Sequence, residues 1–85
     1  MSGNTKPITI GKNNESDIRK VITDVYDALN EKGYDPISQI VGYLLTEDPT
    51  YITTHNNARN LIRHIDRFEL LQILLRDYIG AGNSL

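Results

Sequence analysis

The residues best suited to chemistry in this sequence are three arginines at helical spacing. Arg59, Arg63 and Arg67 lie four residues apart, and His64 follows the second of them. Residues four apart in a helix differ by about 40° in direction and about 6 Å in height, so Arg59 and Arg63 would share one face. Guanidinium groups bind phosphates and carboxylates through paired hydrogen bonds. These three arginines and His64, which we call the arginine row, therefore predict a partner-binding site.

The end of the arginine row allows two interpretations. If Asp66 caps a new helix, Arg67 lies in its first turn, where free N–H groups and the positive end of the helix dipole favour an anion. The alternative is local: Arg63 pairs with Asp66, and the capping carboxylates occupy those N–H groups. A surface ion pair stabilises a fold by only about 0.2 to 1 kcal/mol, which hardly explains three arginines. The sequence leaves both interpretations open.

The sequence gives little support to catalysis or to a metal site. His55 and His64 are nine residues apart and there is no cysteine, so the usual ligand sets of zinc are missing. No glycine-rich phosphate loop and no nucleophile next to a base is recognisable. Carboxylate pairs occur only where solvated helix faces or turns are expected: Asp17 with Asp24, Asp24 with Asp27, and Glu47 with Asp48. We expect a protein that is not an enzyme and that has no metal or other cofactor.

Size and composition indicate one small domain. The 85 residues are 39% hydrophobic and 24% charged, as in ordinary globular chains. So short a chain has a small core and no disulfide to reinforce it, which favours a homodimer. No run of about 18 apolar residues and no export leader is present, so we expect a cytoplasmic protein that does not bind membranes. The net charge of −2 argues against a dedicated nucleic-acid binder.

Residues 1–14 are predicted to form a flexible regulatory tail, because they are rich in glycine and asparagine and lack an apolar face. Ile8–Ile10 alternates like a strand, so pairing with a neighbour's sheet edge is an alternative. Thr5 and Thr9 are hydroxyls that a kinase could reach in such a tail. A phosphate on either would add about −1.5 to −2 charges and would pair well with guanidinium groups. Unmodified, solvated threonines remain the alternative.

Residues 15–80 are predicted to form an all-α domain, a small bundle of about four helices, and residues 81–85 a C-terminal tail. Apolar residues recur at steps of three and four along this domain. Capping signals give the boundaries: Asn14 or Ser16 to Gly33, Asp35-Pro36 to about Leu45, about Thr54 to Ile65, and Asp66 to Gly80-Ala81-Gly82.

Several residues predict how these helices pack. Gly42 in the second helix costs about 1 kcal/mol relative to alanine, which suggests that another backbone lies close to it. Tyr51 and Ile52 are expected to fill the core, and Tyr43 to pack its ring. Asp66 and Glu69 fit a capping box. The inner face predicted for the fourth helix consists of Phe68, Leu71, Leu74, Leu75, Tyr78 and Ile79.

A helix-turn-helix that binds nucleic acid is the alternative function, because the third and fourth predicted helices meet at a short turn. The sequence around them is poor in lysine, and no aromatic stacking residues accompany the arginines. The arginine row is therefore interpreted first as a protein-binding surface.

Two motifs carry a resemblance to a known family. They read "EKGY-P--QIVGYL" from residue 31 and "DP-YI--H--AR--IR---R-E" from residue 48, and a last helix ending in tyrosine follows. With these motifs, residues 21 to 79 closely resemble the IreB/ReoM family of small bacterial regulatory phosphoproteins.

The resemblance implies a cytoplasmic, all-helical homodimer that is the substrate of a transmembrane Ser/Thr kinase with extracellular PASTA repeats. The family controls synthesis of cell-wall precursors and resistance to wall-active antibiotics, in some members by steering Clp-type proteolysis. A threonine in the tail, a few residues before a glycine, takes the phosphate. Counting back from Gly11, that position is Thr5, with Thr9 the second choice.

The resemblance also assigns importance to the arginine row, because functional arginines of the family match Arg59, Arg63 and Arg67. The sequence departs from the family at two neighbouring positions, where Thr53 replaces a proline and Thr54 replaces a further arginine. Its tail, "KPITIGKNN", is basic where the family is usually aromatic and acidic.

Overall fold

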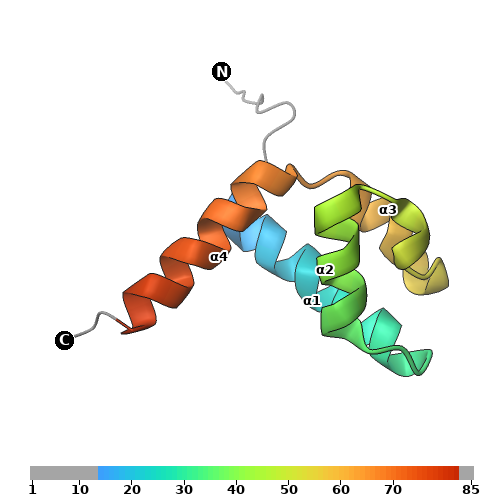
Figure 1. Cartoon of the computed structure of the whole chain (residues 1–85). Helices are drawn as coiled ribbons and strands as arrows, with labels where there is room; N and C mark the ends of the chain where they lie inside the picture. The colour runs from blue at the N-terminus through green and yellow to red at the C-terminus, as the bar shows by residue number, and fades with distance from the viewer. Residues whose placement is uncertain (1–13, 83–85) are drawn as a thin grey trace, which may run out of the picture.

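The computed structural model describes residues 14–82, and this part of the chain is entirely helical (Figure 1). Four α-helices and two short 3₁₀ turns succeed one another: α1 Glu15–Glu31, α2 Pro36–Thr46, η1 Pro49–Tyr51, η2 His55–Asn57, α3 Ala58–Arg63 and α4 Arg67–Gly82. The prediction of an all-α fold with four helices is confirmed for this range. Except for Asn14, the predicted tail, with Thr5 and Thr9, lies outside the described residues, as do residues 83–85.

The first two helices begin at the caps that their sequences predict. The Asn14 side chain accepts a hydrogen bond from the Asp17 N–H at 2.8 Å. The Asp35 side chain accepts one from the Ser38 N–H at 3.4 Å, with Pro36 in the first turn. Gly33 ends the first helical segment with φ of +85°, a left-handed conformation that glycine adopts without a Cβ clash. Local capping chemistry therefore fixes three of the four boundaries of this helix pair.

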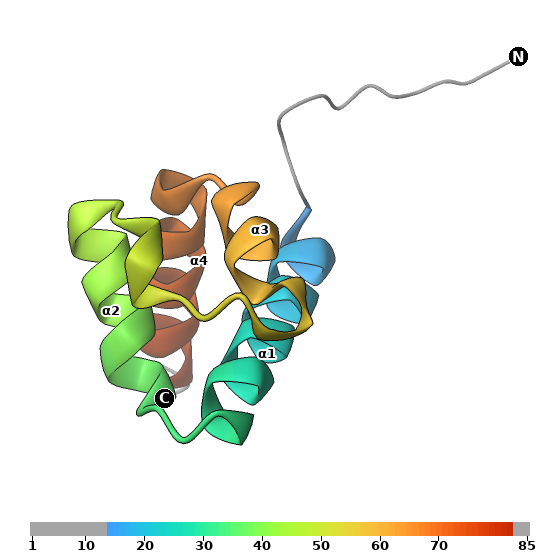
Figure 2. The same ribbon diagram turned by 90° about the vertical axis from the view of Figure 1, so that its right-hand side faces the viewer.

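The core lies where α1, α2 and α3 meet. Within residues 14–80, thirteen hydrophobic residues are buried, and all belong to one cluster. Ile52, between the two 3₁₀ turns, is 0% exposed, so the prediction that it fills the core is confirmed. α2 and α3 both pack against α1, and Figure 2 shows the three helices around the core. This three-helix unit, which we call the body, carries Arg59 and Arg63 on α3.

Gly42 does face a close neighbour, but the neighbour is a side chain rather than a backbone. A Cβ built on Gly42 would overlap the aromatic ring of Tyr51. The ring is held there because the Tyr51 carbonyl accepts a hydrogen bond from Gln39 Nε2 at 2.9 Å. Tyr43 is buried as expected. The glycine in α2 therefore makes room for the segment that leads to α3.

The third helix is shorter than predicted. The expected span was Thr54 to Ile65, whereas α3 covers Ala58–Arg63 and follows the separate turn η2. Asn56 and Asn57 cause the break, because both have left-handed backbone angles, with φ of 52° and 63°. Asparagine tolerates this conformation better than most residues, since its short polar side chain bonds locally.

The fourth helix is where the packing prediction is wrong for a single chain. α4 extends away from the body in Figure 1, and only Leu70 and Ile73 of its side chains are buried. The residues predicted to face inward are exposed instead, by 42 to 81%: Phe68, Leu71, Leu74, Leu75, Tyr78 and Ile79. None of the other helices in the described part of the chain covers this face. α4 ends at Gly82, within the predicted Gly-Ala-Gly stop.

At the start of α4, only one side chain of the predicted capping box forms a capping hydrogen bond. Asp66 accepts a hydrogen bond from the Phe68 N–H at 3.0 Å through its side chain. Glu69 does not complete the box, because its Oε1 is buried without a hydrogen-bond partner. No helix within residues 14–82 combines the length and apolar character needed to cross a membrane.

Candidate functional site

The arginine row is divided in the folded chain. Arg59 and Arg63 line one pocket on the outer side of α3, together with Thr54, Asn57 and Asn60. Arg67 does not line this pocket. We call it the arginine pocket; its volume is about 130 Å³.

Arg59 is held in place by hydrogen bonds to the backbone of the segment before α3. Its Nε donates a hydrogen bond to the Ile52 carbonyl at 2.8 Å, and the side chain is half-buried. Its backbone N–H donates to the Thr53 carbonyl at 3.0 Å. Because the Nε is already bonded, the two terminal nitrogens of the guanidinium group remain for the pocket. The side chain is thus fixed before any ligand arrives.

Arg63 lies one turn further along α3 and is exposed. It forms no ion pair with any residue of the described range. The local alternative, pairing with Asp66, is not formed, because the Asp66 carboxylate accepts from the Phe68 N–H instead. The Arg63 charge is therefore available to a ligand.

The charge of Arg59 acts weakly on the carboxylate of Asp48. The pKa of Asp48 lies below its ordinary value of 3.8 because the Thr50 hydroxyl and the Thr50 N–H bond to it, with a smaller contribution from the Arg59 charge. The Thr50 hydroxyl is 2.7 Å away and its N–H 3.0 Å away. Asp48 is thus held in its charged form by Thr50, and in the described structure it forms no ion pair with Arg59.

Arg67 makes bonds inside the chain. Its Nη1 donates to the Leu44 carbonyl at 2.5 Å, and its Nη2 pairs with Glu47 Oε2 at 2.6 Å. Leu44 and Glu47 belong to the C-terminal end of α2, where carbonyl groups lack partners within the helix. Arg67 therefore fastens the end of α2 to the start of α4.

The two histidines also make internal contacts. His64 ends α3, and its Nδ1 lies 2.8 Å from the Asn60 carbonyl. His55 Nε2 lies 2.8 Å from Glu31 Oε1 and so connects η2 to the end of α1. Neither histidine lines the arginine pocket.

Sequence reasoning missed Asn57 and Asn60 of the pocket, whereas the family resemblance had singled out Thr54 as the position of a further arginine. The adjacent pair Asn56-Asn57 was the available signal, because two asparagines before a helix favour turns with left-handed backbone angles. The turn they form places Asn57 at the pocket.

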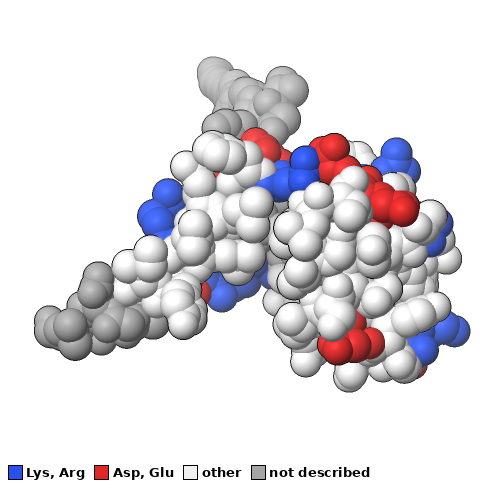
Figure 3. All heavy atoms as spheres, viewed as in Figure 1, with Lys and Arg blue, Asp and Glu red and all other residues white. Residues whose placement is uncertain are grey.

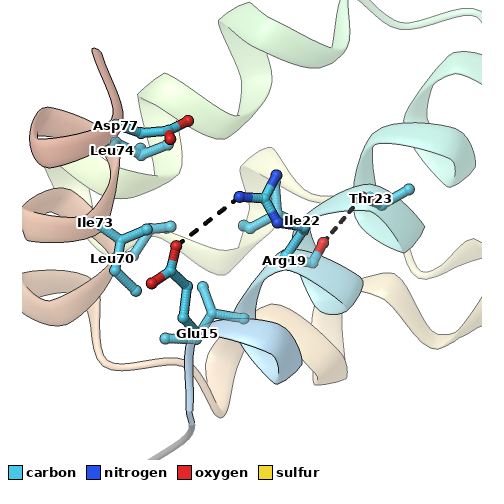
Figure 4. A pocket seen from close by; sticks show the side chains of 9 residues that line it. Glu15, Arg19, Ile22, Thr23, Leu70, Ile73, Leu74 and Asp77 are labelled. Atoms are coloured by element: carbon cyan, nitrogen blue, oxygen red, sulfur yellow. Dashed lines mark hydrogen bonds and ion pairs between the residues drawn. The ribbon is translucent and has the colours of Figure 1, made fainter. Parts of the chain in front are cut away.

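A second pocket of about 130 Å³ lies between α1 and α4 (Figure 4). Its walls are mainly apolar, with Ile18 and Ile22 on one side and Leu70 and Ile73 on the other. The Glu15–Arg19 ion pair, at 3.9 Å, lies at its edge. These apolar walls are part of the contact through which α4 joins the body.

The structure gives no support to the helix-turn-helix alternative. α3 has only 6 residues, and the exposed residues of α4 are mostly apolar. In Figure 3 the surface over α4 and α2 carries few charged groups. A groove-reading helix needs basic and polar residues to contact phosphates and bases.

Comparison with known protein families gives one match over nearly the whole chain. The model of a family described as "IreB regulatory phosphoprotein" matches residues 3–80. The match includes the arginine pocket, Thr5 and Thr9, and it confirms the resemblance drawn from the two motifs. The chain therefore belongs to the IreB family of regulatory phosphoproteins.

Proposed function

We propose that this chain is a non-enzymatic, cytoplasmic regulatory phosphoprotein that acts through protein–protein contacts of its arginine pocket. The observation that carries the proposal is the state of Arg59 and Arg63. One is fixed by the Ile52 carbonyl, the other is exposed, and no acidic side chain lines the pocket they share. Such a surface suits an acidic segment of a partner protein, because guanidinium groups pair with carboxylates in a fixed geometry.

The input to this surface is phosphorylation of Thr5 or Thr9 by a Ser/Thr kinase with PASTA repeats. The output is control of peptidoglycan synthesis and of resistance to wall-active antibiotics, through a regulatory partner such as the Clp protease machinery. Support comes from the family's description as regulatory phosphoproteins and from its match, which begins at residue 3 and so includes both threonines.

The exposed face of α4 supports a homodimer. Six large apolar side chains of this helix are at least 42% exposed, and contiguous apolar patches of this kind are uncommon on monomers. A second copy of the chain brings the same face, so the two can cover each other in a self-complementary contact. The dimer would display two arginine pockets.

The phosphorylation step is tested with the purified chain and the kinase domain encoded by the same genome. Mass spectrometry of the product is expected to locate the phosphate on Thr5, or on Thr9 as the second choice. The Thr5→Ala and Thr9→Ala variants assign it. If neither residue carries phosphate, the proposal that this kinase phosphorylates the chain on Thr5 or Thr9 is wrong.

The output is tested by replacing the native gene with an Arg63→Glu version. We expect loss of the native response to wall-active antibiotics, because the charge of the pocket is reversed while the fold remains. Arg76→Glu is the matched control, since Arg76 is also an exposed helical arginine but lies on α4, away from the pocket. A normal response with Arg63→Glu, at normal protein level and helicity, would exclude the arginine pocket from the output.

A further inference from the structure

The five residues that line the arginine pocket all have side chains that can donate hydrogen bonds, and the carbon atoms of these residues form the rest of its wall. Arg59 and Arg63 contribute guanidinium groups, Asn57 and Asn60 amides, and Thr54 a hydroxyl. Amides and hydroxyls also accept hydrogen bonds, but none of these five side chains carries a negative charge. Two positive charges surrounded by neutral donors match a small anion with several acceptor oxygens.

The size of the pocket limits what that anion can be. The volume is about 130 Å³, whereas pockets that enclose drug-sized ligands start at about 300 Å³. A phosphate group fits such a space. The pocket therefore suits a single phosphate monoester better than a metabolite.

The backbone around the pocket is arranged before any ligand binds. Asn56 and Asn57 both adopt left-handed angles, a conformation that asparagine tolerates and that fixes the turn leading into α3. The Arg59 side chain is fixed by the Ile52 carbonyl at 2.8 Å. A site whose groups are already in place loses less entropy on binding.

The chain itself contains threonines that can bring a phosphate to this place. Thr5 is nine residues before Asn14, and Thr9 is five residues before it. An extended chain spans about 3.3 to 3.6 Å per residue, so Thr5 can reach about 30 Å from Asn14 and Thr9 about 17 Å.

The reach of Thr5 is sufficient for any point on α3. α1 has 17 residues and is therefore about 25 Å long, and α3 packs along it at the usual distance of about 8 to 10 Å between helix axes. The far end of α3 is thus less than about 30 Å from Asn14. Thr9 reaches only the part of α3 nearest to the start of α1.

We propose that the arginine pocket binds the phosphate of phosphorylated Thr5 of the same chain. The phosphate occupies the guanidinium groups of Arg59 and Arg63, so the phosphorylated chain no longer presents them to a partner. This inference rests on the proposed function for the statement that the tail is phosphorylated, and it identifies the place where the modification is read.

The test uses the full chain with phosphothreonine incorporated at position 5 during synthesis, so it does not depend on any kinase. A phosphothreonine has a second pKa of about 6 in water. Two guanidinium groups favour the dianion, so the pKa of the docked phosphate, followed by ³¹P NMR, is expected to be lower than in a phosphopeptide of residues 1–13. Amide signals of Asn57 and Asn60 should shift when the phosphorylated and unmodified chains are compared.

The Arg63→Ala variant of the phosphorylated chain should return the phosphate pKa most of the way to that of the peptide. It should fold normally, because Arg63 is exposed and has no ion-pair partner in the described range. Arg76→Ala is the control and should leave the pKa unchanged. An Arg63→Ala chain with the full pKa shift would overturn the proposal, as would a phosphorylated chain that titrates like the peptide.

Two further samples exclude other sources of phosphate. A chain with phosphothreonine at position 9 should show a smaller shift than the one at position 5; the reverse order would overturn the assignment to Thr5. Inorganic phosphate added to the unmodified chain should shift Asn57 and Asn60 only at much higher concentration than the attached phosphate requires. If it alone shifts them, the pocket binds free phosphate and the proposal is wrong.

The outcome also separates this inference from the proposed function. If the phosphate does not dock but Arg63→Glu has a clear effect in cells, the pocket still binds a partner and only the docking proposal is wrong. If the phosphate docks but Arg63→Glu has no effect in cells, the docking proposal stands and the pocket is not a partner-binding site.

Discussion

The body and α4 both consist of helices rich in large apolar side chains, but they differ in what covers these side chains. In the body, α1, α2 and α3 bury Val25, Leu29, Ile52 and their neighbours against one another. α4 buries only Leu70 and Ile73 and leaves most of its apolar face open. A helix of 16 residues is only marginally stable alone in water. The body is therefore stabilised by contacts within its own chain. The stability of α4 depends on the Arg67 bonds and the Leu70 and Ile73 contacts that join it to the body, and on whatever covers its open face.

The largest expected difference between the two regions comes from the same substitution made in each. Leu29→Ala removes a side chain that is 0% exposed and should cost about 2 to 5 kcal/mol of unfolding free energy at any protein concentration. Leu75→Ala, on the open face of α4 at 59% exposed, should cost much less in dilute solution. Urea denaturation followed by circular dichroism measures both.

The concentration dependence sharpens this comparison. If a second copy covers α4, the cost of Leu75→Ala should rise with protein concentration, since a ligand that binds only the folded state stabilises it by mass action. An equal cost for the two variants at every concentration would contradict the division into a self-supporting body and a dependent α4.

The second largest effect is expected for Arg67, which joins the body to α4. Arg67→Ala removes the bonds to the Leu44 carbonyl and to Glu47, and hydrogen bonds of charged groups contribute about 1.5 to 3 kcal/mol each at most. We expect a loss of about 1 to 3 kcal/mol and faster hydrogen exchange at the start of α4. Arg63→Ala, a few residues earlier, should stay within about 0.5 kcal/mol. Equal effects of the two would show that Arg67 does not hold the joint.

The arginine row shows how much of the site could be predicted. Helical spacing correctly placed Arg59 and Arg63 on one surface, because both lie within a single helix. The cap predicted at Asp66 correctly placed Arg67 in the first turn of the next helix, but no local pattern could give its bond to Leu44, 23 residues earlier in the chain. A contact over such a distance depends on how the helices pack, which periodicity does not encode.

For the fold as well, features with a local cause could be predicted from the sequence, whereas features that depend on distant contacts could not. The caps at Asn14 and Asp35 were predictable because a side chain bonds to an N–H three residues away. The open face of α4 was not, since an apolar stripe predicts that something covers it and does not identify the cover. The helix break at Asn56 and Asn57 was only partly predictable, because asparagine permits left-handed angles but does not require them.

Close packing within the body can be tested at Gly42, with a smaller effect. Gly42→Ala should gain about 1 kcal/mol in helix propensity and lose about 1 to 3 kcal/mol through overlap with the Tyr51 ring, a small net loss. In a Tyr51→Ala background the ring is absent, and the same change should stabilise the chain by up to about 1 kcal/mol. A double-mutant cycle by urea denaturation measures this reversal. The same sign in both backgrounds would mean that the ring does not constrain Gly42.

The smallest effect concerns Asp48, at the turn that leads from α2 toward the arginine pocket. Its pKa is lowered first by the Thr50 hydroxyl and then by the Thr50 N–H, with Arg59 contributing less. A lowered carboxyl pKa stabilises the fold above the unfolded pKa, and this contribution is lost as the pH falls through the lower, folded value. It should therefore be complete at neutral pH and disappear only below the ordinary value of 3.8.

Two substitutions divide the causes of this pKa shift. Thr50→Ala removes the hydroxyl and should raise the Asp48 pKa, measured by NMR titration of the side-chain carboxyl, more than Arg59→Lys does, because lysine keeps the charge. By raising the folded pKa toward the unfolded one, each change should reduce the contribution of this carboxylate to stability at neutral pH, and Thr50→Ala should reduce it more. At a pH below the folded pKa this contribution is already lost in every variant. A larger rise with Arg59→Lys would reverse the order of causes. It would mean that the geometry of the Arg59 guanidinium, rather than the Thr50 turn, holds Asp48 charged, and that the pocket and the turn act as one electrostatic unit.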